Sequence, residues 1–146
     1  MSFYCEITKE KIMTSDFLLH FTNPLHGALN TFFGVVREYN LGKQVVAIEY
    51  DAFVPLTQKC FATLCAEAQT RWGGDLQIIL YHRIGHLFVG DISVAIGVSS
   101  VHRDESVLAS RYIIEVLKKR APIWKKEYYA QGASEWVKGH ALCQHY

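Results

Sequence analysis

The sequence predicts an α+β fold with mixed or antiparallel sheets and three main helices. Segments with strand composition come mostly in pairs, and helical patterns separate the pairs, giving the order β-α-β-β-α-β-β-α. A parallel doubly wound sheet would instead alternate single strands with helices. The chain of 146 residues fits a single domain over residues 1–146, because no repeat or linker divides it.

Five segments have the β-branched and aromatic composition of strands: residues 3–9, 28–38, 45–53, 76–84 and 91–100. The second and third are joined by YNLGKQ, whose Asn40 and Gly42 suit a loop, so we expect these two strands to form an antiparallel pair. The fourth and fifth are separated by a turn that contains Gly85 and Gly90.

Three segments have helical patterns: from about residue 14 to residue 23, from Pro55 to about Trp72, and from about Asp104 to Arg120. We expect Thr14 or Ser15 to cap the first helix. The second carries one apolar stripe and should end at Gly73-Gly74. An irregular C-terminal tail is expected after the third helix.

The bulk composition excludes several classes of protein. Half of the residues are apolar and the net charge is only +1, which favours an ordered globular protein over a general nucleic-acid binder. No apolar run approaches the roughly 18 residues of a membrane span, and the N-terminus lacks a signal pattern. We therefore expect a cytoplasmic protein.

The cysteines predict neither a disulfide framework nor a zinc site. None of them forms a C-x-x-C pair, and metal ligands are not clustered at recognisable spacing. We interpret them as small apolar core residues: Cys5, Cys60, Cys65 and Cys143.

Positive charge is concentrated in LKKRAPIWKKE, residues 117–127, which hold five of the 15 Lys and Arg residues. For Lys118 and Lys119 the simplest interpretation is a solvated helix end, where cations complement the helix dipole. Pro122 makes the chain turn, however, and we expect Ile123 and Trp124 to anchor that turn. Lys125 could then fold back towards Lys118, and two adjacent ammonium groups depress at least one pKa, as acid, base or nucleophilic catalysis requires.

The remaining candidates are His-Arg pairs and one strand-end arginine. His102-Arg103 lies between a strand and a helix N-terminus, which suits an anion; alternatively Asp104 or Ser100 caps the helix and Arg103 faces solvent. We expect His82-Arg83 to lie in a turn or subunit contact. A metal site from His82, His86 and His102 has little support, because no carboxylate or Cys lies at matching spacing. A lone Arg37 at a strand end is usually solvated.

Several motifs, taken in order, resemble one known family. They are GALNTFFGVVREYNLGKQV, IEYDAF, YHRIGHLFVGD, VSSVHRDESVLAS and LKKRAPIWKKE. Together they span roughly residues 27–137 and are similar to the large, catalytic subunit of molybdopterin synthase. The first 26 residues match poorly, and Pro55-Leu56 stands where relatives often have a small residue and Met.

The resemblance implies a fold and a function. The fold would be an α/β hammerhead, in a homodimer that binds one small ubiquitin-like subunit at each end to give a heterotetramer. The enzyme would transfer sulfur from the thiocarboxylate of that subunit's C-terminal Gly-Gly to cyclic pyranopterin monophosphate, forming the dithiolene of molybdopterin. No cofactor or metal is implied. The alternative is a non-catalytic binding module for a ubiquitin-like tail.

The resemblance also assigns residues to the site. Lys118 and Lys125 would be the catalytic lysines. Arg37, His102 and Arg103 would bind the pterin phosphate. No catalytic cysteine is implied, because the sulfur arrives on the partner.

Overall fold

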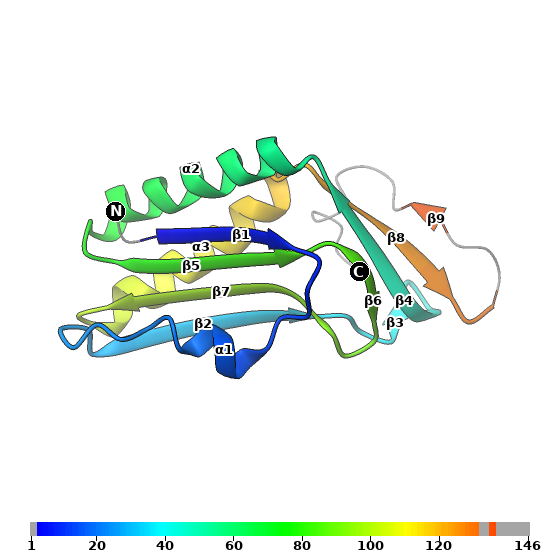
Figure 1. The fold of residues 1–146 in the computed structure, drawn as a ribbon, viewed down its shortest axis with the longest axis horizontal. Helices are drawn as coiled ribbons and strands as arrows, with labels where there is room; N and C mark the ends of the chain where they lie inside the picture. The colour runs from blue at the N-terminus through cyan, green and yellow to red at the C-terminus, as the bar shows by residue number, and fades with distance from the viewer. Residues whose placement is uncertain (1–2, 132–134, 137–146) are drawn as a thin grey trace.

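Two sheets, two long helices and one short helix form the part of the chain that the computed structural model describes, residues 3–131 and 135–136. A four-stranded sheet makes up one end of the molecule, and the second sheet lies at its other end (Figure 1). The predicted α+β class is confirmed, with one mixed and one antiparallel sheet.

The first sheet has the strand order β1-β5-β7-β2. β1 runs parallel to β5, and the other pairs are antiparallel. Eight consecutive residues of β7 are buried, because this central strand is covered on both faces. The strands are β1 Phe3–Thr8, β2 Ala28–Val35, β5 Gln77–Arg83 and β7 Ile92–Ser100.

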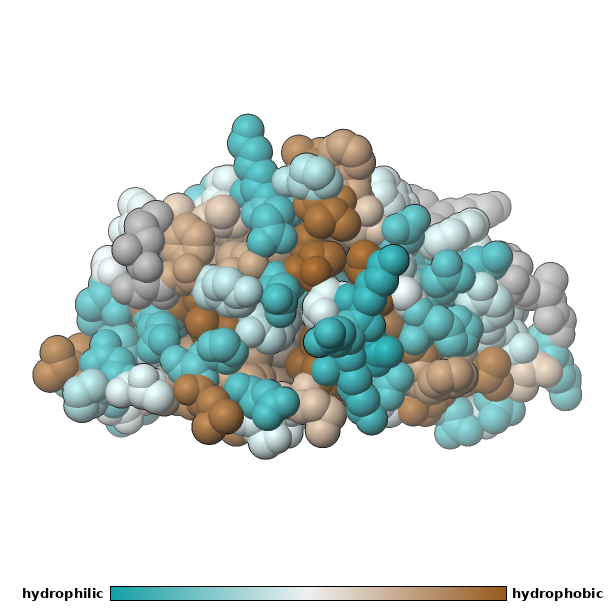
Figure 2. Space-filling model, viewed as in Figure 1, coloured by the Kyte–Doolittle hydropathy of each residue, from teal (hydrophilic) through white to brown (hydrophobic). Residues whose placement is uncertain are grey.

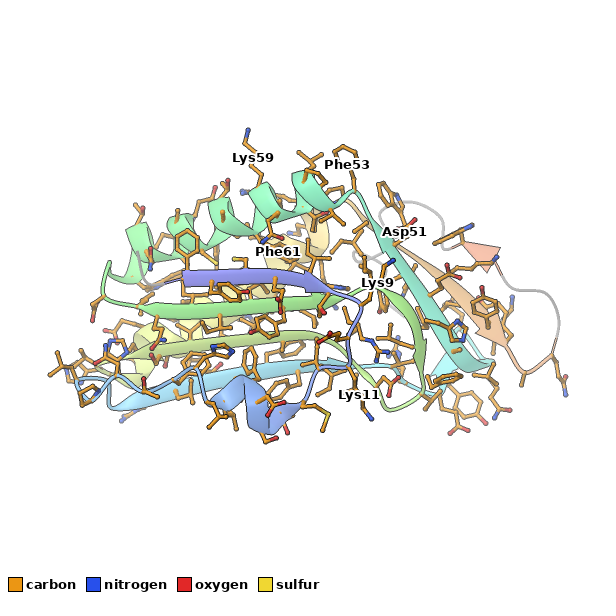
Figure 3. All side chains as sticks on the ribbon, in the orientation of Figure 1. Lys9, Lys11, Asp51, Phe53, Lys59 and Phe61 are labelled. Carbon is orange, nitrogen blue, oxygen red and sulfur yellow. The ribbon has the colours of Figure 1, made fainter. Side chains whose placement is uncertain are left out.

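Both long helices, α2 (Val54–Trp72) and α3 (Arg103–Arg120), pack on one face of this sheet (Figure 1). The predicted stripe of α2 is confirmed: four of its five members are fully buried and Trp72 is partly buried against the same core. In Figure 3, Phe61 points from α2 towards the sheet, whereas the exposed Lys59 points away from it. As predicted, α2 ends before Gly73, whose φ of 130° suits glycine.

The short helix α1 (Thr14–Leu18) covers the opposite face of the first sheet. Its Phe17 is buried in a second, smaller apolar cluster over β5 and β7. The predicted cap and length were wrong. The N-cap is Met13, with no side-chain hydrogen bond, and the helix ends five residues before Asn23.

The second sheet contains β3, β4, β8 and β9 in that order, and β6 also pairs with β4. Its strands are β3 Tyr39–Asn40, β4 Lys43–Ala52, β6 Gly85–Phe88, β8 Ile123–Tyr129 and β9 Glu135–Trp136. The expected antiparallel pair of residues 28–38 and 45–53 was wrong, because β2 pairs with β7 and β4 pairs with β8. The segment expected to be an irregular tail begins with β8.

The start of β8 corrects one further expectation. Ile123 is buried and anchors the chain after Pro122, but Trp124 is 47% exposed and does not.

The exposed Phe53, Val54 and Leu56 give the molecule an apolar surface at the first turn of α2, seen as brown atoms in Figure 2. Among the described residues, no helix combines the length and apolar character needed to span a membrane.

Candidate functional site

A cavity of about 450 Å³ lies where the two sheets meet. Its wall is built from the end of β2 and the residues after it, β3, the middle of β4, His82 of β5, the start of β7, the last turn of α3, and β8. Residues with polar side chains on this wall are Arg37, Asn40, Tyr50, His82, Ser93, Lys118, Lys125 and Glu127. Three of the five residues that the sequence assigned to the site therefore share one cavity.

The strand β8 places Lys125 and Glu127 side by side. Alternate residues of a strand point to the same face, so the two side chains both reach the cavity. Across the antiparallel ladder, Tyr50 lies opposite Lys125 and Ile48 opposite Glu127. These four residues form one continuous patch of the cavity wall.

Lys118 approaches the same cavity from the last turn of α3, and Arg37 from the chain just after β2. Helix α3 ends as the sequence predicted, with Ala121 extended before Pro122. The turn returns the chain along β4, which carries Lys125 back beside Lys118. The folding back of Lys125 towards Lys118 is thus confirmed.

The surroundings of Lys125 lower its pKa below the ordinary lysine value. Burial is the largest cause, the negative charge of Glu127 opposes it, and the positive charges of Arg37 and Lys118 lower the pKa further. The sequence predicted the effect of the second lysine but not the larger effect of burial. A lysine of this kind can exchange its proton more readily near neutral pH than a solvated one.

Glu127 is a buried acid, only 3% exposed, held by neutral donors. Asn40 Nδ2 donates to both of its carboxylate oxygens at 2.7 Å, and the Tyr129 hydroxyl donates to Oε1 at 3.0 Å. These hydrogen bonds compensate the carboxylate for lost water. They also fix a negative charge two residues from Lys125, where it limits the fall in the lysine pKa.

His82 was expected in a turn or subunit contact, and that was wrong. It lies inside β5, is 1% exposed, and packs edge-on against Tyr50 with 5.1 Å between ring centroids. Burial lowers the pKa of His82 to about 4. The ring is therefore neutral at physiological pH, and it lines the cavity.

His102 and Arg103 lie elsewhere in a single copy of the chain. Both line a second hollow of about 470 Å³ with Gly27, Ala28, Val101 and Asp104, at the N-terminus of α3. Fifteen residues of helix separate Arg103 from Lys118, which at about 1.5 Å per residue is about 22 Å. His102 is the N-cap of α3, so neither Asp104 nor Ser100 caps the helix as the alternative interpretation had it, but Arg103 is exposed, as that interpretation had it.

The sequence interpretation missed Asn40, Tyr50, His82 and Glu127 as cavity residues. Recognising 123–129 as a strand would have supplied part of the signal, because the spacing K-x-E then puts Lys125 and Glu127 on one face. No group of three or more His, Cys, Asp or Glu side chains among the described residues could hold a metal ion. Cys143 lies outside the described residues.

Comparison with known proteins places the chain in one family. The family model described as "MoaE protein" matches residues 7–120. A molybdopterin synthase catalytic subunit from Synechococcus elongatus is 48% identical over 119 residues, which cover 82% of this chain and 72% of the relative. Lys125 lies just beyond the span of the family model.

Two solved structures share the fold. The crystal structure of molybdopterin synthase from Staphylococcus aureus superposes with a TM-score of 0.86 at 37% identity, over 92% of this chain and 96% of that one. A chain from the complex of subunits 1 and 2 of molybdopterin-converting factor from Helicobacter pylori gives a TM-score of 0.78 over 94% and 92% of the two chains, at 19% identity, so it is similar in fold alone. The chain belongs to the MoaE family of molybdopterin synthase catalytic subunits, enzymes of molybdenum cofactor biosynthesis.

Proposed function

We propose that the cavity at the junction of the two sheets is the sulfur-transfer site, with Lys118 and Lys125 as its catalytic lysines. The observation that carries the proposal is the convergence of Lys118, Lys125 and Arg37 on one cavity from three separate parts of the fold. The sulfur donor is the C-terminal thiocarboxylate of a small ubiquitin-like subunit that ends in Gly-Gly, and the acceptor is cyclic pyranopterin monophosphate. The reaction takes place in the cytoplasm.

The positive charge of the cavity suits both reactants, because a thiocarboxylate and a phosphate ester are both anions. In each transfer the thiocarboxylate sulfur displaces an oxygen from a carbon of the pterin's side ring. The carbon–sulfur bond forms as the carbon–oxygen bond breaks, and the oxygen leaves as water or stays on the phosphate, with a lysine ammonium group able to supply the proton. Water then cleaves the acyl–sulfur bond, so that the tail leaves as a carboxylate and the sulfur stays on the pterin. Ammonium groups at fixed positions stabilise the negative charge that develops on the acyl oxygen during this cleavage.

The proposal includes a homodimer that binds one small subunit at each end. His102 and Arg103 lie about 22 Å from Lys118 along α3, too far for one pterin phosphate to reach both groups within a single copy. A second copy related by a twofold axis would bring its own His102 and Arg103 to the cavity. In this arrangement they bind the phosphate while the lysines of the first copy act on the sulfur donor.

The second candidate function is a module that docks the Gly-Gly tail without turnover. The partly buried position of Lys125 argues against it. Holding an anion needs only an accessible cation, whereas a lysine with a lowered pKa is suited to chemistry.

The test is dithiolene formation from purified chain, thiocarboxylated small subunit and cyclic pyranopterin monophosphate. Lys125→Ala should lower the rate on the order of 10²–10³-fold. Lys126→Ala is the matched control, since Lys126 alternates to the other face of β8 and lies over the Tyr128 ring at 5.4 Å. Equal rates for Lys125→Ala and wild type would remove Lys125 from the mechanism, and no product from wild type would favour the docking module.

A further inference from the structure

Sulfur transfer uses the positive charge of the cavity but assigns no ligand group to two neutral, nitrogen-containing side chains of its wall. These are Asn40 of β3 and His82 of β5, which are 5% and 1% exposed. Both can be assigned as hydrogen-bond acceptors from the groups that surround them. Both residues line the same cavity as the cations Arg37, Lys118 and Lys125.

The orientation of the Asn40 amide follows from its contact with Glu127. Both carboxylate oxygens lie 2.7 Å from one amide atom, and an ionised carboxylate only accepts hydrogen bonds. That atom must therefore be the nitrogen, and the amide oxygen is turned away from Glu127. Oδ1 is buried and accepts no hydrogen bond from any residue within 3–131 and 135–136. A buried acceptor of this kind is uncommon in folded proteins and needs an explanation, such as a donor supplied by a bound molecule.

The tautomer of His82 is fixed in the same way. Nδ1 lies 2.8 Å from the main-chain carbonyl oxygen of Arg83, which cannot donate. Nδ1 must therefore carry the proton, and Nε2 of the neutral ring is an acceptor. Desolvation keeps the ring neutral, because it lowers the pKa of His82 to about 4.

Both side chains contact the patch that Lys125 and Glu127 of β8 form with Tyr50 and Ile48 of β4. Asn40 is bonded to Glu127, while His82 packs against Tyr50, the residue opposite Lys125. Lys125 and Glu127 are two residues apart on one strand, a separation of about 7 Å. A ligand that fits this cavity should therefore carry an anionic group and also N–H donors.

We propose, on the basis of the function proposed above, that Asn40 and His82 determine specificity by accepting hydrogen bonds from the amino and lactam N–H groups of the pterin ring. The 2-amino-4-oxopyrimidine edge of a pterin presents N–H donors at adjacent positions. A lumazine carries a carbonyl oxygen where the pterin has its amino group. That oxygen would face another acceptor and leave it unpaired, which is a strong basis for discrimination.

The experiment compares the binding of 6-carboxypterin and 6-carboxylumazine to the full chain by calorimetry. Both probes carry a carboxylate for the cations, so the ratio of their dissociation constants reports the exchange of the 2-amino group for a carbonyl, together with the proton that this exchange places on N1. Wild type should prefer the pterin on the order of 10- to 100-fold. Asn40→Ser should reduce this ratio several-fold, because its hydroxyl can still donate to Glu127 but the amide oxygen is lost. His82→Phe should reduce the ratio independently.

The control is Asn23→Ser, the same substitution at an exposed residue outside this cavity, which should leave the ratio unchanged. Retained lumazine binding shows that a variant is folded with an intact cavity. If Asn40→Ser binds neither probe, His82→Phe decides the question. A wild-type ratio near 1, or variants with the wild-type ratio, would overturn the proposal.

A third binding measurement covers the other source of N–H groups, a peptide ending in Gly-Gly. Weaker binding of that peptide by Asn40→Ser with an unchanged pterin ratio would assign the acceptors to the tail and overturn the proposal. Failure of the proposed function would be seen in a different measurement. The wild type would then form no dithiolene, whatever the ratio of its dissociation constants for the two probes. A wild type that makes dithiolene but binds both probes equally would refute only the role of Asn40 and His82.

Discussion

At the scale of single residues, Lys125 shows how a protein can tune one amine through several neighbours. Burial lowers its pKa, Glu127 raises it, and Arg37 and Lys118 lower it again. Burial alone would favour loss of the charge. Glu127, itself held by Asn40 and Tyr129, limits that loss without neutralising the cavity as a whole. The site therefore keeps its attraction for anions and still contains an amine that can give up a proton.

The neighbours of Lys125 should shift its titration in opposite directions. Glu127→Gln removes a negative charge that favours the ammonium form, so the pKa of Lys125 should fall further. Lys118→Ala removes a like charge that disfavours the ammonium form, so the pKa should rise towards the ordinary value. The ¹³Cε chemical shift of Lys125, followed by NMR against pH, measures both changes. Shifts of the same sign in the two variants would contradict this account of the site.

At the scale of elements, local pattern identified both long helices and most strands, but not which strands pair. The sequences of β2 and β4 look like a hairpin because a short Asn- and Gly-containing connection joins them. The structure instead sends the chain from one sheet to the other between these strands. Which strands pair depends on how the two faces of each strand can be buried. For β2 and β4 the partners are β7 and β8, which come much later in the sequence.

The strand β8 was missed for a related reason. Its sequence, IWKKEYY, carries three charged residues, and two of them face the cavity. A strand is recognised in a sequence by the alternation of apolar and polar residues. Charged residues that line a cavity interrupt this alternation, so the pattern is lost. The resemblance therefore identified Lys125, while the neighbours that tune it became visible only in the folded chain.

The short helix α1 depends on a glycine in the sheet beneath it. A Cβ placed on Gly97 would lie 2.7 Å from Phe21 Cε2 and 3.0 Å from Phe17 Cε2. Gly97→Ala should therefore push this aromatic pair off β7 and cost about 1–3 kcal/mol of unfolding free energy. Gly74→Ala is the control, because nothing lies within 4 Å of its added Cβ, and it should be neutral or slightly stabilising. Urea unfolding measures both, and equal midpoints would show that α1 does not rest on Gly97.

At the scale of the whole molecule, α3 separates two hollows that the family resemblance assigns to one site. Its N-terminus carries His102 and Arg103, and its last turn carries Lys118. A helix of 18 residues is rigid on this scale, so bending within one copy cannot join the two ends. Two copies with a twofold axis can join them, because each copy then contributes opposite ends of α3 to two equivalent sites.

This arrangement makes mixed dimers informative. In a dimer of one Lys125→Ala chain and one Arg103→Ala chain, one composite site contains both substitutions and the other contains neither. Such dimers, purified by two different affinity tags, should regain about half of the wild-type rate of dithiolene formation, although each variant homodimer is impaired at both sites.

The control pairs Lys125→Ala with Lys118→Ala. These two lysines line the same cavity of one chain, so every site in the mixed dimer keeps one defect and no recovery is expected. If the rate recovers when the Lys125→Ala chain is paired with Arg103→Ala but not when it is paired with Lys118→Ala, the cause is the geometry of the sites. Improved folding of mixed dimers would raise the rate in both pairings. If neither combination recovers, each site is complete within one copy, and the roles of His102 and Arg103 must be sought in their own hollow at the start of α3.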